Sequence, residues 1–594
     1  MSTTAIELQG LTYTFDEQSD PVLNHITLSI PKGQWVAVLG RGGSGKSTLC
    51  QLLNGYLPRS GGGHRSGAVR VEGMDPAVAS LADIAHVIGI VFQDADAQLV
   101  QGNVEADVAF GPENLRVPPA DIAHRVTAAL AAVGLTPHRD AAVRELSGGQ
   151  RQRAAIAAVL ALAPRLLVFD DATASLDGAA QVQFVQLCEV LHEQGRTLLC
   201  ASGRFDDVAR AAERVIVLEG GAVVLDGTPQ ELLASCAEQL VQLGLLPTTE
   251  WAEHPSTPSP RPALSAGVVP KGVDLEGVAA SSSSIPALGD EPKGVDLEGV
   301  AASSSYIPAL EDDPKLVDLE GISASSSSNL ALEGDPKGVE LEAIPTAPLL
   351  VPVLPVVEQR PFSSRFTTGN DERISLLAVK SLSYAYPRGA EALHKVSFTL
   401  QPGDWVTLMG ENGSGKTTLS RLLMGLLRAP GQMVYWRGQD IANIPIYTLA
   451  EEIGYVFQQP EHQFVAHTVW EEITYGCVSM GRRKRRQLTP QQRDTAEQML
   501  LEAGLLHRRE DSPYLLSQGE KRLLSVVSQF MIPKRMYILD EPTSGIDYIA
   551  AQRILKLCRQ QVLKGNALLM ITHDPDLVQR EATFSLKLHQ GRLV

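Results

Sequence analysis

Short apolar runs, each followed by glycine or acidic residues, recur in two separate blocks of the chain. "WVAVLG" (residues 35–40) and "RLLVFDD" (165–171) in the first block match "WVTLMG" (405–410) and "RMYILDE" (535–541) in the second. Apolar runs of this length, bounded by turn residues, are typical of buried strands in a parallel sheet. Helical patterns follow the glycine loops, so the sequence predicts an α/β core in each block.

A longer helical pattern separates the paired apolar runs within each block, at about residues 105–145 and 468–512. Examples are "ADIAHRVTAALAAVGL" in the first block and "PQQRDTAEQMLLEAGL" in the second. Because strands, glycine loops and helices come in the same order twice, we predict two domains of one kind, residues 1–245 and 374–594. Each is expected to carry a helical insertion in its α/β core.

Residues 246–373 between the blocks have a different composition. "PKGVDLEGVAASSSSIPALGDE" starts at Pro270 and recurs at Pro292 and Pro314, with a fragment at Pro336, which gives a period of 22 residues. A fixed period can mean a folded solenoid. The few apolar residues per repeat favour instead a disordered, acidic, serine-rich linker. A coil of about 130 residues spans roughly 60 Å, so the two blocks can face each other within one chain.

Charge and cysteine content narrow the class of protein. The net charge is −17, and residues 270–342 alone carry 15 acidic residues and 4 lysines, a net of −11. The two folded blocks are therefore nearly balanced, which argues against a protein that coats nucleic acid. The six cysteines form no CxxC pair, so we expect small buried thiols in a reducing compartment.

No part of the sequence predicts insertion into a membrane. No run approaches the ~18 to 20 uninterrupted apolar residues that a membrane helix needs. The N-terminus "MSTTAIELQG" lacks the basic flank and apolar core of a signal peptide. We expect a soluble chain that meets a membrane only through partners.

The strongest local signal is a phosphate-binding loop, which occurs twice. "GRGGSGKS" (residues 40–47) and "GENGSGKT" (410–417) each follow a predicted strand and open a predicted helix. The glycines let backbone N–H groups turn inward around phosphates, while the lysine reaches the β- and γ-phosphates and the following hydroxyl ligates Mg²⁺. Because the motif occurs twice, each time between a predicted strand and a predicted helix, we reject the alternative of a chance glycine turn.

Each block also contains a strand that ends in two acids, Asp170 with Asp171 and Asp540 with Glu541. The first acid suits the shell of a magnesium ion, and the second suits the polarisation of an attacking water. An isolated acidic pair after a strand is usually a solvated edge. The phosphate loop earlier in each block favours the catalytic interpretation.

Further motifs resemble those of ABC ATPases. "LSGGQRQR" (residues 146–153) resembles the family signature, and "LSQGEKR" (516–522) resembles a variant of it. Gln93 and Gln458 match the family's Q-loop, "ASLD" and "SGID" match its D-loop, and His573 matches its switch histidine. The resemblance implies two P-loop ABC ATPase domains, joined by the disordered linker, that use ATP and Mg²⁺. Each domain is expected to have a RecA-like core, an antiparallel β subdomain and a helical subdomain.

The resemblance also implies a role for each matched residue. The residues expected in catalysis are Glu541, His573, Gln458 and Asp171. The expected metal ligands are Ser47, Gln93 and Asp170 in the first block and Thr417, Gln458 and Asp540 in the second. Phe15 and Tyr386 fall where the family places a ring against adenine, although either could equally be core packing. The other expected nucleotide contacts are Gly40, Gly42, Gly43, Ser44, Gly45, Lys46, Ser47, Thr48, Gly410, Asn412, Gly413, Ser414, Gly415, Lys416, Thr417, Thr418, Ser147, Gly148, Gly149, Gln150, Ser517, Gln518 and Gly519.

A narrower resemblance is to the ATPases of energy-coupling-factor importers, which take up vitamins and transition metals. It is carried by the stretches after each Q-loop, "VFQDADAQLVQGNVEADVAFGPENL" and "VFQQPEHQFVAHTVWEEITYG". It implies two membrane partners, a transmembrane coupling (T) subunit and a substrate-binding (S) subunit, with no nucleic-acid partner. The chain would then lie at the cytoplasmic face of the cell (inner) membrane, as a peripheral subunit. The solute would be chosen by the partner.

The family further implies that the two blocks pair head to tail, each ATP lying between one block's phosphate loop and the other block's signature. Site one would then combine Lys46, Asp170, Asp171 and Gly203 with the signature "LSQGE". Site two would combine Lys416, Thr417, Asp540, Glu541 and His573 with the signature "LSGGQ".

Three departures from the family fall on site one. Asp171 is one methylene shorter than the family's glutamate, which withdraws its carboxylate by ~1.5 Å. Gly203 stands in place of the histidine, so it offers no side chain to a γ-phosphate, and Glu520 adds negative charge. We expect site two to hydrolyse ATP while site one mainly binds it. The alternative is that Asp171 still serves as the base and that a neighbour such as Ser202 replaces the histidine.

Two other classes of tandem ABC ATPase remain as alternatives. A soluble ABC ATPase of translation or DNA repair shares the tandem layout, but the acidic, serine-rich linker does not fit the basic or helical linkers of that class. A tandem sugar-importer ATPase would leave the stretches after the Q-loops unexplained.

Overall fold

The computed structural model describes residues 3–16, 20–174, 176–247, 375–386, 391–479, 488–573 and 581–594. The predicted linker, residues 246–373, lies outside these ranges except for its first two residues. Both halves of the chain belong to one compact unit. No helix in the described ranges is long and apolar enough to cross a membrane.

The first half is built on a six-stranded sheet in the order β5-β6-β7-β3-β8-β9. Its strands pair in parallel except for the β8–β9 hairpin. The strands are β3 (Trp35–Leu39), β5 (Ile88–Val91), β6 (Leu166–Asp170), β7 (Thr197–Ser202), β8 (Arg214–Glu219) and β9 (Ala222–Gly227). Every residue of β3, β6 and β7 is buried, which confirms that the continuous apolar runs are central strands.

A separate antiparallel sheet, in the order β2-β1-β4, completes the β structure of the first half. It consists of β1 (Thr4–Thr14), β2 (Leu23–Pro31) and β4 (His64–Val71). Burial alternates along β2, because one face covers the core and the other faces solvent. The antiparallel β subdomain implied by the family resemblance is therefore present.

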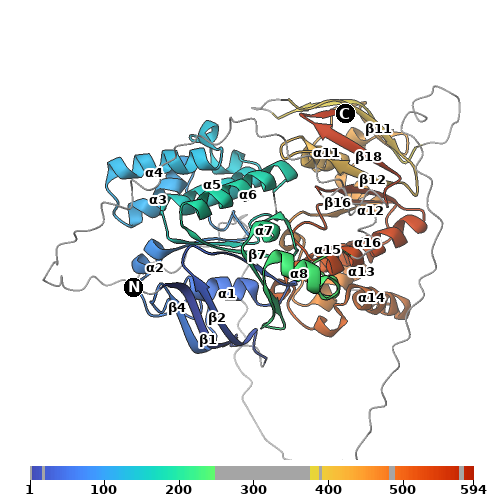
Figure 1. Cartoon of the computed structure of the whole chain (residues 1–594). Coiled ribbons are helices and arrows are strands. Elements are labelled where there is room, and N and C mark those ends of the chain that lie inside the picture. The colour runs from blue at the N-terminus through green and yellow to red at the C-terminus, as the bar shows by residue number, and fades with distance from the viewer. Residues whose placement is uncertain are drawn as a thin grey trace, which may run out of the picture. The chain divides into compact units, whose positions relative to one another are not determined.

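The helices of the first half form two groups. The helical insertion consists of α3 (Val104–Asn114), α4 (Pro119–Ala132) and α5 (Gly148–Ala161), which lie together apart from β1, β2 and β4 (Figure 1). The remaining helices are α1 (Lys46–Leu53), α2 (Leu81–Val87), α6 (Gly178–Glu193), α7 (Asp207–Ala211), α8 (Pro229–Ser235) and α9 (Ala237–Gln242).

The second half repeats the same plan. Its main sheet has the order β15-β16-β17-β12-β18-β19, and its second sheet has the order β11-β10-β13-β14. The strands are β10 (Leu377–Ala385), β11 (Glu391–Leu400), β12 (Trp405–Met409), β13 (Val434–Trp436), β14 (Gln439–Asp440), β15 (Ile453–Val456), β16 (Met536–Asp540), β17 (Ala567–Ile571), β18 (Phe584–His589) and β19 (Arg592–Leu593).

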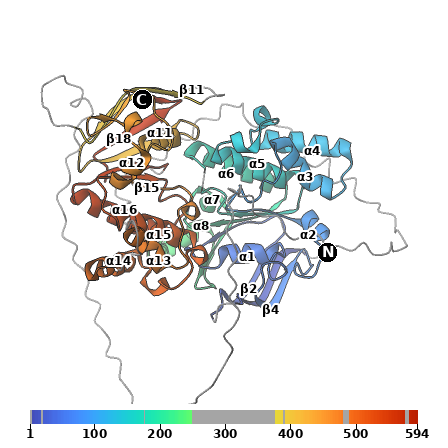
Figure 2. The same ribbon diagram turned by 180° about the vertical axis from the view of Figure 1, so that it is seen from behind.

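The helical insertion of the second half is made of α13 (Val469–Ser479), α14 (Pro490–Ala503) and α15 (Gln518–Phe530), which again lie together (Figure 2). The other helices are α11 (Lys416–Leu423), α12 (Ile446–Glu452) and α16 (Tyr548–Leu563). Both α1 and α11 start directly after a glycine with a left-handed backbone, Gly45 at φ 98° and Gly415 at φ 103°. Residues with a Cβ rarely adopt this conformation, so a glycine is needed where strand turns into helix.

Candidate nucleotide sites

The lysine of each phosphate loop is buried and folded back across the loop. Lys46 Nζ donates to the carbonyl oxygens of Gly40 at 2.6 Å and Arg41 at 3.0 Å. Lys416 Nζ donates to the carbonyls of Gly410 at 2.7 Å and Glu411 at 2.9 Å. Burial lowers the pKa of Lys416, against the opposing effect of Glu541 and Asp540. Each loop therefore presents an ammonium group where the motif requires one.

Each loop also contains a buried hydroxyl without a partner. Ser44 Oγ and Ser414 Oγ have no hydrogen bond to any described group. Buried polar atoms are nearly always satisfied, so an orphaned hydroxyl in the same position of both loops indicates an external acceptor. A phosphate oxygen fits that requirement.

The hydroxyl and the first acid of the first half lie together. Ser47 Oγ donates to Asp170 Oδ1 at 3.1 Å, and burial raises the pKa of Asp170, an effect that this bond opposes. In the second half Asp540 Oδ2 accepts a hydrogen bond from Tyr455 at 3.1 Å, and burial together with the charge of Glu541 raises the pKa of Asp540 to about 6. A hydroxyl and a carboxylate are hard oxygen ligands that suit Mg²⁺, which keeps most of its shell as water and phosphate oxygens.

The second acid of the second half is surrounded by the two other expected catalytic side chains. Gln458 Nε2 donates to Glu541 Oε2 at 3.0 Å, and His573 Nε2 lies 2.8 Å from Glu541 Oε1. This short contact joins the imidazole to the carboxylate of Glu541. Burial raises the pKa of Glu541, but His573, Lys416 and Arg522 outweigh it and bring the pKa below its usual value.

The matching acid of the first half has a different environment. Burial raises the pKa of Asp171 to about 6, and within the described ranges its carboxylate accepts one hydrogen bond, from the backbone N–H of Gly203 to Oδ1 at 3.2 Å. Ser202, the proposed substitute for a histidine, donates its hydroxyl to Asp206 Oδ2 at 3.1 Å. The hydroxyl proton is therefore already donated to Asp206.

The phosphate loop of each half lies against the other half. A Cβ at Gly42 would lie 2.9 Å from Ser517 Oγ, so this loop faces the second signature. Asn412 N, in the other phosphate loop, donates to Asp177 Oδ2 at 2.9 Å, and Asp177 ends the "ASLD" motif. Ser544 Oγ also donates to the carbonyl of Ala174.

Arg204 adds contacts between the halves beside Gly203. Its Nε donates to the carbonyl of Ile546 at 2.6 Å and an Nη donates to that of Thr543 at 3.0 Å. Its guanidinium lies 4.6 Å from the centre of the Tyr548 ring. The loop that follows the empty histidine position is thus anchored to the D-loop of the other half.

Both signature motifs form helix N-termini. Ser147 and Gln150 form a capping box at α5, and Ser517 and Glu520 form the same box at α15. Glu520 also lies 3.7 Å from Arg508. Its charge therefore has a structural use that the motif alone did not indicate.

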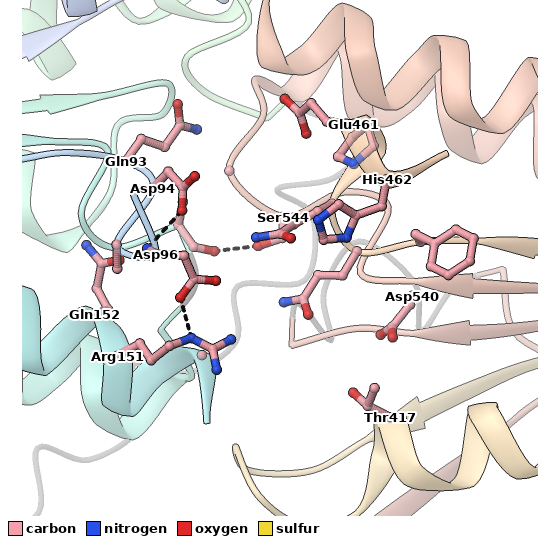
Figure 3. Close-up of a pocket in the computed structure, with 18 of the residues that line it drawn as sticks. Gln93, Asp94, Asp96, Arg151, Gln152, Thr417, Glu461, His462, Asp540 and Ser544 are labelled. Carbon is pink, nitrogen blue, oxygen red and sulfur yellow. Dashed lines mark hydrogen bonds and ion pairs between the residues drawn. The ribbon is translucent and has the colours of Figure 1, made fainter. Parts of the chain in front are cut away.

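A cleft of about 1190 Å³ contains many of the expected residues. It is lined by Thr417, Gln458 and Asp540 of the second half and by Gly148 and Gln152 of the first. Figure 3 shows Gln93, Asp94, Asp96, Arg151 and Gln152 facing Thr417, Glu461, His462, Asp540 and Ser544. The cleft brings metal-ligand candidates of one half together with the signature of the other.

Three expected residues make none of the contacts described above for the metal and base candidates. Gln93 lines the cleft, and within the described ranges its side chain makes no hydrogen bond to Ser47 or Asp170. Phe15 packs edge-on against Tyr13 with ring centres 5.1 Å apart. Tyr386 is exposed, and its hydroxyl lies 3.2 Å from Thr418 Oγ1, at the N-terminus of α11.

Sequence reasoning missed a pair of buried acids that shape the loops after the Q-loops. Asp107 Oδ1 accepts the N–H groups of Val100 and Gln101, each at 2.8 Å. Glu472 Oε2 likewise accepts two successive N–H groups, those of residues 465 and 466, each at 2.9 Å. The available signal was an acid in the same place of "VEADVAFG" and "VWEEITYG".

The phosphate loop, the acid-ended strand and the capped signature helix, each present twice, define a tandem P-loop ATPase. A family model described as ABC transporter matches residues 23–174 and 393–544, just over half of the chain. The chain belongs to this family, and its two domains bind ATP and make it an ATPase.

Relatives match nearly the whole chain. A protein of Methanosarcina acetivorans, provisionally named an ABC transporter ATP-binding protein, is 30% identical over 99% of this chain and 85% of its own length. A Bacillus subtilis protein, provisionally named HMP/thiamine import ATP-binding protein YkoD, is 29% identical over 99% of this chain and 90% of its own. The solved structure of cbiO1 from Clostridium perfringens, titled as part of the ABC transporter complex cbiONQ, is 33% identical, with a TM-score of 0.36. It covers 41% of this chain and 96% of that one.

Proposed function

We propose that the chain is the ATP-hydrolysing subunit of an energy-coupling-factor importer, with hydrolysis at site two and nucleotide retention at site one. The observation that carries this division is the contrast between the two second acids. Glu541 has Gln458 and His573 within 3.0 Å, whereas among the described residues Asp171 has a backbone N–H at 3.2 Å as its one hydrogen-bond donor. The proposal assigns catalysis to the half with the complete set of side chains.

Head-to-tail pairing of the halves within one chain is part of this proposal. The approach of Gly42 to Ser517 and the bond from Asn412 N to Asp177 support it, because each joins a phosphate loop to a motif of the other half. The cleft that contains both Thr417 and Gly148 supports it for site two. The domain boundaries 1–245 and 374–594 and the linker between them belong to the same proposal.

At site two each residue has a distinct task. Glu541, ionised at neutral pH because its pKa is below the usual value, accepts the proton of the attacking water. His573 Nε2, which lies 2.8 Å from Glu541 Oε1, would turn to the γ-phosphate, and Gln458 orients the carboxylate from the other side. Thr417, Asp540 and Gln458 would hold Mg²⁺, which would neutralise the charge on the β- and γ-phosphates.

The membrane partners would dock on the loops after the Q-loops. Val100 and Val465 are exposed in these loops, and the apolar side chains of Tyr475 in α13 and Leu515 before the second signature are exposed as well. Exposed apolar residues beside loops held rigid by buried acids suit a helical partner. This supports a transmembrane T subunit with an S subunit, and a peripheral position at the cytoplasmic membrane face. The name of the thiamine-import relative supports a vitamin-class solute.

Substitution of the two acids tests the division of labour. In the full chain, co-purified with its membrane partners, Glu541→Gln should reduce kcat by at least about 10²-fold, because it removes the base. Asp171→Asn should change kcat by less than about threefold under the same conditions, because that carboxylate lacks the catalytic geometry. Comparable losses in the two variants would refute the proposed asymmetry.

A further inference from the structure

Helix α15 of the second half reaches both nucleotide sites. Its N-cap Ser517 lies against Gly42, in the phosphate loop of site one. One turn further along, Arg522 extends from the same helix toward site two, where it lines the cleft together with Asp540. Ser517 and Arg522 are five residues apart, about 1.4 turns of one helix, so the two contacts belong to the same rigid element.

The side chain of Arg522 forms a hydrogen bond to the backbone of Glu541. Its Nη1 donates to the carbonyl oxygen of Glu541 at 2.7 Å. The same carbonyl accepts the N–H of Ser544 at 3.3 Å, and Glu541 N donates to the carbonyl of Ile571 at 3.0 Å. The peptide unit of Glu541 is therefore held on both sides, and Arg522 is the side chain that holds it.

This bond matters because Glu541 has a left-handed backbone, with φ 50°. A residue with a Cβ adopts this conformation only where its surroundings enforce it. If the carbonyl lost a strong donor, the carboxylate would lose its fixed direction toward Gln458 and His573. A charged donor forms the stronger kind of hydrogen bond, which suits the task.

The first half provides a natural comparison. Asp171 has the same strained backbone, with φ 48°, and its carbonyl accepts the N–H of Ala174 at 3.1 Å. Gln152 occupies the place of Arg522 in the first signature, and its buried Nε2 has no hydrogen-bond partner in the described ranges. Within the described ranges, the first half therefore lacks a side-chain donor equivalent to that of Arg522.

We infer that Arg522 is a positioning residue that fixes Glu541 for hydrolysis and makes that fixation depend on how α15 docks at site one. The inference rests on the proposed role of Glu541. Nucleotide at site one would hold the α15 N-terminus against the first phosphate loop, and Arg522 would carry this to the carbonyl of Glu541. Site one would then act as a regulatory nucleotide site for site two.

The first experiment compares Arg522→Gln, which installs the residue of the first half, with Arg553→Gln. Arg553 is a matched control, because it also donates to a backbone carbonyl of the second half, that of Ala503 at 3.2 Å. In the full chain Arg522→Gln should lower kcat by about tenfold with an unchanged KM for ATP, because misplacement of a catalytic group by ~1 Å costs up to about 10²-fold. Arg553→Gln should retain wild-type kcat. A wild-type kcat in Arg522→Gln would overturn the inference.

A second variant protects the test against a loss of folding. Arg522→Lys keeps the charge and one donor, so it should recover part of the kcat with the wild-type melting temperature. If Arg522→Gln does not fold, Arg522→Lys decides alone: a kcat at least about threefold below wild type at unchanged KM supports the inference, and a wild-type kcat overturns it.

The coupling between the sites is tested with Lys46→Ala, which weakens nucleotide binding at site one. Lys46→Ala should lower kcat in the wild-type chain. It should lower kcat little further in the Arg522→Gln variant, because both changes interrupt the same coupling between the sites. Losses that multiply would overturn the coupling. Glu541→Gln separates the failures: if it leaves hydrolysis intact, the proposed function fails, and if only the Arg522 variants behave as wild type, this inference alone fails.

Discussion

At the scale of single residues, the two strand-ending acids differ by more than one methylene. Burial raises the pKa of Glu541, but His573, Lys416 and Arg522 bring it below the usual value. Asp171 lacks the imidazole, and burial raises its pKa to about 6. The two acids nevertheless share the same left-handed backbone, with φ 48° at Asp171 and φ 50° at Glu541.

Site one should regain part of its activity when its side chains are restored. A Cβ at Gly203 would meet its nearest neighbours, Asp547 N and Ile546 C, at 3.7 and 3.9 Å, which is ordinary contact. In the Glu541→Gln background, Asp171→Glu with Gly203→His should raise the residual ATPase rate by at least about tenfold, since one lost donor typically costs ~10² to 10³-fold.

The matched control for this restoration is Asp171→Glu with Gly203→Ala in the same background. Alanine fills the space without an imidazole, so the rate should stay near that of Glu541→Gln alone. Equal rates in the two triple variants would show that the histidine position has no part in the defect.

At the scale of elements, the helical insertion is tied to the Q-loop by one buried acid in each half. Glu472 on α13 accepts two successive N–H groups with a single oxygen, although it is only 5% exposed. Burial raises the pKa of Glu472, and the two backbone bonds only partly oppose this. The loop beside the expected partner site is therefore fixed at a cost in stability.

Glu472→Gln should stabilise the chain at pH 8, by roughly 1 to 4 °C in melting temperature, because an amide oxygen keeps both bonds without a buried charge. The folded pKa is raised above the unfolded one, so the penalty of the charged carboxylate grows as the pH rises from the unfolded to the folded pKa and is complete above the folded pKa. The gain should shrink as the pH falls through that pKa. The control is Glu471→Gln, at an exposed acid on the same turn, which should leave the melting temperature at pH 8 unchanged.

At the scale of the whole molecule, we expect the first phosphate loop to pair with the second signature of the same chain and not with that of another copy. A Cβ at Gly42 would lie 3.2 Å from the Cβ of Ser517, close to the separation in a disulfide. The double variant Gly42→Cys with Ser517→Cys should form an intramolecular crosslink on oxidation, detected as a monomer of altered mobility in a non-reducing gel.

The single-cysteine variants serve as controls, since four of the six native cysteines are buried and all six are free thiols. A crosslinked dimer in place of the monomer would contradict pairing within one chain, and no crosslink at all would contradict the close approach of Gly42 to Ser517.

Much of the fold followed from local pattern. Continuous apolar runs marked β3, β6, β12 and β16, because strands covered on both faces must be apolar throughout. The phosphate loops could be recognised because their chemistry needs glycines, a lysine and a hydroxyl at fixed spacing. The roles of Glu520, Glu472 and Arg522 could not be recognised from the sequence, since each of these side chains acts on a partner that only packing brings near.

By itself the sequence determined that this protein has two α/β ATPase domains, each with a phosphate loop, an acid-ended strand and a signature, and that Asp171 and Gly203 depart from the family. These are contiguous motifs whose chemistry is set by residue type and spacing. Only the tertiary structure decided what surrounds each acid, with Gln458 and His573 beside Glu541 and Ser202 engaged elsewhere. It also decided that Arg522 braces Glu541, because a bond between a helix and the end of a strand arises only when the domain folds.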